Sequence, residues 1–149
     1  MTIRRTARVL CTASALALSP VAMGGASAQD SASAPVLSLE LNAVQPSDKG
    51  CRLTFVVANG LGGDLARAAF ELALFDAAGV VDRLTVLDFR DMPAGKTKVS
   101  RFDLPGADCA SITRVLVNHA TECQGTGIAP DACMRSLKTA TKTTVAFGT

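Results

Sequence analysis

The stretch Ala69-Phe-Glu-Leu-Ala-Leu-Phe-Asp-Ala-Ala-Gly-Val-Val-Asp-Arg-Leu-Thr-Val-Leu-Asp-Phe89 contains two runs rich in β-branched and aromatic residues, separated by Asp76-Ala-Ala-Gly79. A short loop with Asp at its start and Gly at the position that needs a positive φ is typical of a β-hairpin. Apolar side chains recur at every second position of both arms, at Phe70, Leu72, Leu74, Leu84 and Val86. Leu87 and the pair Val80-Val81 interrupt this period. This alternation predicts a hairpin with one buried side and one half-wet side, as in one sheet of a β-sandwich.

Strand and turn signals continue through the rest of the chain at intervals of about eight to twelve residues. The other expected strands are 36–44, 51–58, 97–104, 112–119 and an edge strand within the Thr-rich tail 138–147. The glycine-rich segment 59–64 is expected to form a loop, and 65–68 a short turn. Pro130 and Asp131 suit a first helical turn, which predicts a short helix over 130–137. About seven strands without a long helix predict an all-β fold, an immunoglobulin-like antiparallel β-sandwich, with a small closed barrel as the alternative.

The first 28 residues have the three parts of an export signal. Arg4, Arg5 and Arg8 precede a moderately apolar segment, and Ala26-Ser-Ala28 supplies small residues for cleavage. A membrane anchor is the alternative, but it would need about 20 uninterrupted apolar residues. We therefore expect a signal peptide at 1–28, a flexible lead-in at 29–35 and a single β-sandwich domain at 36–149. The Arg4-Arg5 pair permits the twin-arginine route, and the general secretory route competes with it.

Removal of 28 of the 149 residues leaves 121, which is a one-domain length. The signal holds three of the 15 basic residues, so 12 remain against 13 acidic residues. The mature chain therefore has a net charge of about −1, and it has no basic cluster and neither Trp nor Tyr. These features argue against nucleic-acid binding.

Four cysteines follow the signal, and an even number in a small exported chain predicts two disulfides. Cys123 and Cys133 are close enough in sequence to clip one loop, which leaves Cys51 with Cys109. Cys51 has the parity of the apolar positions in its strand, so we expect it to point into the core. Zinc is the alternative, but the chain has neither a Cys-x-x-Cys pair nor a second His.

Candidate chemistry centres on His119, the only histidine, which is expected at the end of a strand and near Cys123. No Gly-x-Ser-x-Gly elbow accompanies it, and the cysteines are better explained as bridged. A copper or small-ligand site through His119 with Met92 or Met134 is one alternative, because soft ligands suit that metal. A hydrolase whose carboxylates converge only in the fold is another. We expect no catalytic residue, no metal and no cofactor.

The chain also resembles a set of small exported bacterial proteins that carry a twin-arginine signal and have no assigned function. The motifs of the resemblance span roughly residues 37 to 133: Leu39-Glu-Leu-Asn42, Cys51-Arg-Leu-Thr-Phe55, Asn59-Gly-Leu-Gly62, Leu74-Phe-Asp76, Gly79, Val81-Asp-Arg-Leu84, Pro93-Ala-Gly-Lys96, Phe102-Asp-Leu-Pro-Gly106, Cys109 and Arg114-Val-Leu-Val-Asn118. These motifs consist of residues that form strands and turns. The resemblance therefore implies a shared fold and the twin-arginine route, and it supplies no catalytic residue.

Together these features predict an exported protein, periplasmic or secreted, that acts as a non-enzymatic binding or interaction module. End loops or an exposed sheet edge are the expected contact surfaces. The expected partner is a protein or an envelope component, and no membrane span remains after cleavage of the signal.

Overall fold

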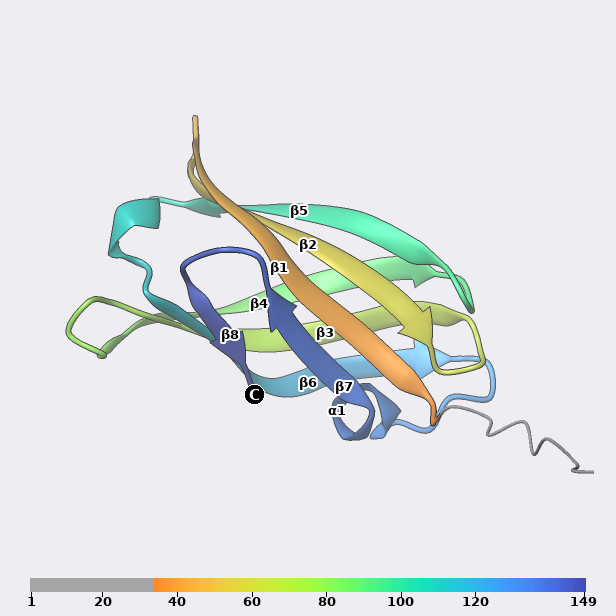
Figure 1. The fold of residues 1–149 in the computed structure, drawn as a ribbon. Helices are drawn as coiled ribbons and strands as arrows, with labels where there is room; N and C mark the ends of the chain where they lie inside the picture. Colours follow the sequence, from red (N-terminus) through yellow and green to blue (C-terminus); the bar gives the residue numbers. More distant parts are fainter. Residues whose placement is uncertain (1–33) are drawn as a thin grey trace, which may run out of the picture. The chain divides into compact units, whose positions relative to one another are not determined.

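The computed structural model describes residues 34–149, so the predicted signal peptide and most of the predicted lead-in lie outside the described residues. Two four-stranded sheets enclose the core, which confirms the predicted all-β sandwich (Figure 1). The first sheet has the order β5-β2-β1-β7 and consists of β1 (Val36–Ser47), β2 (Gly50–Gly60), β5 (Thr97–Pro105) and β7 (Leu137–Thr141). The second has the order β4-β3-β6-β8 and consists of β3 (Leu65–Phe75), β4 (Val81–Met92), β6 (Arg114–Gly125) and β8 (Ala146–Gly148).

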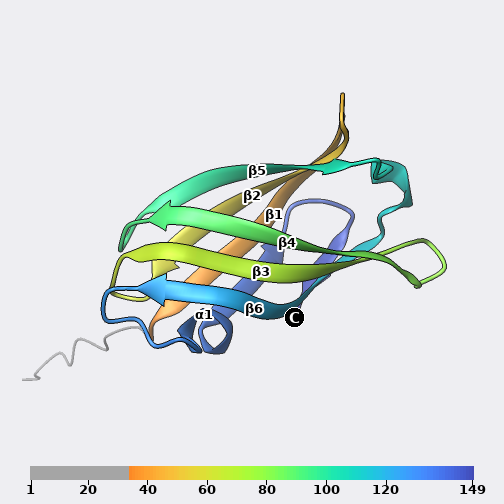
Figure 2. The ribbon, with the colours of Figure 1, turned by 180° about the vertical axis from the view of Figure 1, so that it is seen from behind.

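The predicted hairpin is the β3–β4 pair, and its loop projects beyond the neighbouring strands (Figures 1 and 2). Gly79 has a φ of 76°, in the left-handed region that a residue without Cβ adopts readily. Asp76 Oδ1 accepts hydrogen bonds from the backbone N–H groups of Ala78 and Val80, each at 2.9 Å. The Asp and the Gly of the loop therefore have the separate roles that the sequence predicts.

The core lies between the inner faces of the two sheets and is built from alternate residues of their strands. Phe55 of β2 packs edge-on against Phe89 of β4, with ring centroids 5.5 Å apart, and so joins the two sheets. Phe89 also meets Phe102 of β5 at 5.0 Å. Such edge-to-face pairs add roughly 0.5–1.5 kcal/mol each beyond the burial of their surface.

The side of β4 that enters the core differs from the simplest interpretation of its sequence. Leu87 and Phe89 are buried, whereas Leu84 and Val86, which alternate with Arg83 and Thr85, are exposed. The register places Leu87 opposite the buried Phe70, and successive side chains of a strand point to opposite faces. The outer face of β4 consequently exposes Leu84 and Val86 beside the charged Asp88 and Arg90.

Three further boundaries differ from the predictions. The expected turn at 65–68 is wrong, because β3 already begins at Leu65. The strand expected at 112–119 continues to Gly125, so His119 lies in the middle of β6 and not at its end. The tail forms two short strands: β7 pairs in parallel with β1, and β8 pairs in parallel with β6. The tail thus crosses from one sheet to the other and occupies an edge of each.

A short α-helix, α1 (Ala132–Arg135), confirms the predicted helix near the C-terminus. A 3₁₀-helix, η1 (Cys109–Ser111), lies in the connection between β5 and β6, and Asp108 caps it by accepting a hydrogen bond from the N–H of Ala110 at 3.0 Å. Among residues 34–149, no helix has the length and apolar character needed to cross a membrane.

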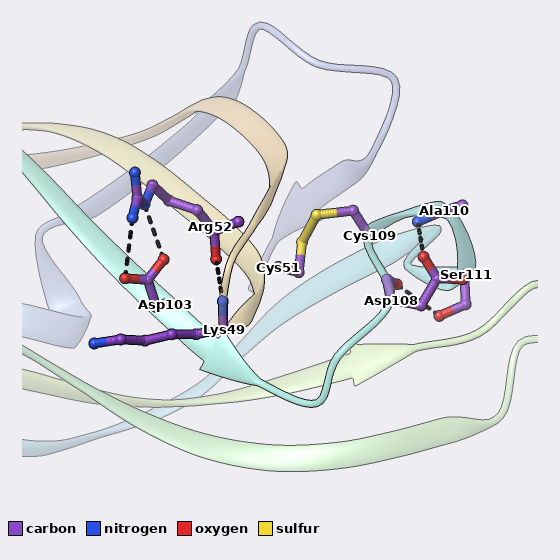
Figure 3. Close-up of a disulfide and its surroundings, with 9 residues drawn as sticks. Lys49, Cys51, Arg52, Asp103, Asp108, Cys109, Ala110 and Ser111 are labelled. Atoms are coloured by element: carbon purple, nitrogen blue, oxygen red, sulfur yellow. Dashed lines mark hydrogen bonds and ion pairs between the residues drawn. A yellow bond between two sulfur atoms is a disulfide. The ribbon is translucent and has the colours of Figure 1, made fainter.

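Disulfides join Cys51 to Cys109 and Cys123 to Cys133, the same two pairs that the spacing favours. Cys51 is fully buried, and its bridge ties the start of β2 to η1 (Figure 3). This bridge therefore anchors the connection that leads from the first sheet to the second. The other bridge ties β6 to α1.

Candidate interaction surface

Five large apolar side chains are exposed among the described residues, and four of them lie between positions 80 and 86. Their exposed fractions are 59% for Val80, 47% for Val81, 57% for Leu84 and 53% for Val86. We call these four residues the β4 patch. Val99 of β5 is 55% exposed and belongs to the other sheet. An apolar cluster left in contact with water on one strand marks an interaction surface more often than scattered single residues do.

Three residues of the β4 patch, Val81, Leu84 and Val86, lie on the edge strand β4, and Val80 directly precedes it. Within residues 34–149, β4 pairs only with β3, so half of its backbone N–H and C=O groups have no ladder partner (Figure 2). Two basic side chains link this edge to β5 of the other sheet. Lys98 donates from Nζ to the carbonyl of Arg90 at 2.6 Å, and Arg83 donates from Nη1 to the carbonyl of Pro105 at 3.0 Å.

These two links flank the middle of the strand. Charged side chains at a sheet edge hinder uncontrolled pairing with other chains. Here Arg83 of β4 makes one link and Lys98 of β5 makes the other at the carbonyl of Arg90. The backbone of 84–88, between these two positions, has no such link. The uncovered segment coincides with the exposed side chains of Leu84 and Val86.

A network of ion pairs lies beside the β4 patch on the same sheet. Arg67 of β3 donates to Asp88 at 2.7 Å and to Glu122 of β6 at 2.7 Å, while Arg90 donates to Asp88 at 2.9 Å. The hydrogen bond from Arg67, assisted by that from Arg90, holds the pKa of Asp88 below its usual value, against a smaller opposing effect of burial. Two cations and two anions neutralise one another here, so this part of the face presents little net charge to a partner.

His119 lies on the outer face of β6, paired in register with Glu71 of β3. Its Nδ1 is 3.6 Å from Glu71 Oε1, an oxygen that accepts a hydrogen bond from Asn118 Nδ2 at 2.7 Å. The structure does not bring His119 together with either candidate methionine. Met92 is buried and pairs with Leu65, six residues and about 20 Å along β3 from Glu71.

Met134 lies in α1 and packs against the core, whereas the side chain of His119 is half-exposed outside the sheet. In the described part of the chain, no three His, Cys, Asp or Glu side chains gather as a group that could hold a metal ion. The copper prediction thus has a histidine and one neighbouring carboxylate, without the sulfur ligand on which it depended.

A cleft of about 440 Å³ opens at one end of the sandwich, between the loops that follow β2, β4 and β6. Asp64 and Asp91 both line it, together with Met92 and Pro93. Asp64 Oδ1 accepts a hydrogen bond from the N–H of Ala94 at 2.8 Å. Both aspartates are exposed at the mouth of this cleft.

A buried asparagine holds this end of the molecule in place. Asn59 is 1% exposed, and its Nδ2 donates to the carbonyls of Gly63 and Met92 at 2.9 and 2.8 Å. Its Oδ1 accepts from the N–H of Leu61 at 3.1 Å. The glycine-rich loop is therefore tied to the end of β4 by one side chain.

The β4 patch is the functional candidate that the sequence analysis did not isolate. The signal was present, because the run Leu84-Thr-Val-Leu-Asp-Phe89 places apolar residues on both parities of one strand. A strand of that kind is either buried on both faces or leaves one apolar face open. The two cases differ in whether a second layer covers the outer face, and the exposed side chains of Leu84 and Val86 show that none of the described residues covers it.

Comparisons of this chain with family models, with curated proteins and with solved structures found no match.

Proposed function

We propose that this protein is exported to the periplasm or secreted, and that it acts there as a non-enzymatic interaction module. The β4 patch is its contact surface, and the partner is a protein or a component of the envelope. The observation that carries this proposal is the group of four exposed apolar side chains beside an uncovered edge segment. Two disulfides are compatible with an exported protein.

The chemistry of such a surface favours binding over a reaction. Exposed main-chain groups at a sheet edge give affinity, and the alternate side chains beside them give selectivity. Leu84 and Val86 provide the apolar contacts, and the ion pairs Asp82–Arg83 and Asp88–Arg90 lie at the two ends of the uncovered segment. An extended strand with alternating apolar residues fits this arrangement.

Site-specific photo-crosslinking in the producing cell tests the proposal. A photoreactive residue replaces Val86 in one variant and Val99 in the other, two positions of nearly equal exposure on different sheets. We expect adducts from position 86 and none from position 99. Absence of adducts at 86, or equal yields at both positions, would contradict a contact surface on β4.

A further inference from the structure

We infer that Asn59 is a modification site: it loses its side-chain amide by deamidation when the end of the sandwich that it holds opens, and the native fold blocks this reaction. The chain has three asparagines, and only Asn59 is followed by glycine. Gly60 has no Cβ to obstruct the approach of the preceding side chain, and it adopts backbone conformations that other residues disfavour. Asn59 is therefore the asparagine whose local chemistry favours deamidation most in an open chain.

Deamidation joins the side chain of Asn59 to the backbone. The peptide nitrogen of Gly60 attacks Cγ of Asn59, so that a new C–N bond forms and the bond from Cγ to Nδ2 breaks. Nδ2 leaves as ammonia with the proton of the Gly60 N–H. Water then opens the cyclic imide at either of its carbonyls, which gives aspartate or isoaspartate at position 59. Water is the only co-reactant, and no electron is transferred.

The folded structure opposes the departure of Nδ2. This atom donates to the carbonyls of Gly63 and Met92 at 2.9 and 2.8 Å, and the side chain is 1% exposed. Departure as ammonia requires a further proton on Nδ2, yet both of these partners are hydrogen-bond acceptors. The departing amide would also leave the buried carbonyl of Met92 without its donor, which costs free energy.

The fold also holds the attacking nitrogen away from Cγ. Asn59 donates from its backbone N–H to the carbonyl of Lys96 at 3.0 Å, so its own peptide groups face β5. Peptide groups alternate in direction along a strand, and the N–H of Gly60 consequently faces β1, where its register partner is Val36. The two backbones are close, because a Cβ at Gly60 would lie 2.7 Å from the carbonyl oxygen of Val36. Attack on Cγ therefore requires this end of β2 to leave the ladder.

One contact of the site favours the reaction instead. Oδ1 of Asn59 accepts a hydrogen bond from the N–H of Leu61 at 3.1 Å. A donor at this oxygen stabilises the negative charge that develops on it during attack. The contact does not release Gly60 or supply a proton to Nδ2, so the reaction still requires an opening of this end of the molecule.

The modified end does not return to the native arrangement. Aspartate at position 59 places a carboxylate opposite two carbonyl oxygens in a buried site. Isoaspartate instead lengthens the main chain by one methylene within the β1–β2 ladder. Each product lowers the stability of the fold, so the modified fraction of the protein increases with the time that this end has spent open.

Incubation of the oxidised protein at neutral pH, in buffer and in guanidinium chloride above the unfolding midpoint, tests the inference by peptide mapping. In the unfolded chain Asn59 should convert faster than Asn42 and Asn118, and Gly60→Ala should slow its conversion because the methyl group obstructs attack. In the folded protein the conversion should be at least about a hundredfold slower, which corresponds to an opening free energy of about 2.8 kcal/mol. Equal rates in the two conditions, or a rate in the unfolded chain that Gly60→Ala does not change, would overturn the inference.

Ala43→Gly provides the matched control. It creates a second Asn-Gly pair at Asn42, which is exposed and lies at the bulge of β1. In the folded variant Asn42 should convert while Asn59 does not, and equal protection of the two would overturn the assigned role of the buried hydrogen bonds. Partly converted protein that is returned to buffer tests irreversibility. Its modified fraction should unfold at a lower denaturant concentration than its unmodified fraction, and equal midpoints would contradict a lasting loss of stability.

Discussion

Replacement of Asn59 by Ala should be among the most destabilising polar substitutions in this protein. The side chain is 1% exposed and takes part in three hydrogen bonds with backbone groups: two donated, at 2.9 and 2.8 Å, and one accepted, at 3.1 Å. A typical hydrogen bond contributes about 1 kcal/mol net, and a buried group that loses its partner costs about 1–3 kcal/mol. The carbonyl of Met92 is one such group, because its hydrogen bond with Asn59 is buried. We therefore expect a loss of about 3 kcal/mol in the free energy of unfolding.

Urea unfolding of the oxidised protein, followed by circular dichroism, measures this loss. The midpoint should fall while the slope m stays constant, which separates a change in stability from a change in the denatured state. Asn42→Ala is the matched control, since Asn42 is exposed and donates only to Glu40, at 3.0 Å. The control should change the free energy of unfolding by no more than about 0.5 kcal/mol.

Asn59→Asp tests the two donated hydrogen bonds of Asn59 separately from the accepted one. The variant keeps an acceptor for the N–H of Leu61 but presents a carboxylate oxygen to the carbonyls of Gly63 and Met92. At pH 7 it should be at least as destabilising as Asn59→Ala, because an anion then faces two acceptors in a buried site. A loss below about 1 kcal/mol for Asn59→Ala, or a loss equal to that of Asn42→Ala, would refute the assigned role of this side chain.

Three other predictions concern the bridges, an ion pair and a glycine. Removal of the Cys51–Cys109 bridge by double substitution with Ala should lower the free energy of unfolding by about 4 kcal/mol, and removal of the Cys123–Cys133 bridge by about 3 kcal/mol. The first bridge closes the longer loop, since the sequence separations are 58 and 10. Urea midpoints that show a larger loss for the Cys123–Cys133 bridge would contradict this order. The pKa of Asp88 is lowered in the folded state by its hydrogen bond with an arginine of β3, so the stability it contributes is present above about pH 4 and disappears as the pH falls through the folded pKa. Asp88→Asn should consequently be less stable than the unmodified protein at pH 7, and the two unfolding curves should converge at acid pH; a gap of constant size would exclude the pair as its source. Gly50→Ala should lower the free energy of unfolding by more than about 2 kcal/mol, because Gly50 has a φ of 135° and a Cβ there would lie 2.5 Å from a carbonyl oxygen of β5. Gly62→Ala is the control in the same urea assay. Gly62 has open space around it, so this variant should show only the backbone strain of about 1 kcal/mol.

Local physical chemistry determined much of this architecture from the sequence. The loop 76–79 requires an Asp that accepts backbone N–H groups and a Gly at positive φ, and both needs are satisfied within a few residues. The alternation in β1, β2 and β3 establishes which residues share a face, because the side-chain period of a strand is two. The spacing of the cysteines likewise narrowed their pairing, because a ten-residue separation can close a single loop.

Tertiary structure decided what alternation leaves open. Two interleaved apolar sets compete in β4, and pairing of Leu87 with Phe70 brings one set into the core and leaves Leu84 and Val86 in water. The interior position of Asn59 likewise depends on Met92, which is 33 residues away in the sequence. A strand carries its own periodicity, but whether a face is buried depends on the sheet packed against it, and that contact is formed by distant parts of the chain. The apolar surface proposed here for binding therefore depends on which face of β4 the other sheet covers, and the sequence of the strand alone does not determine that.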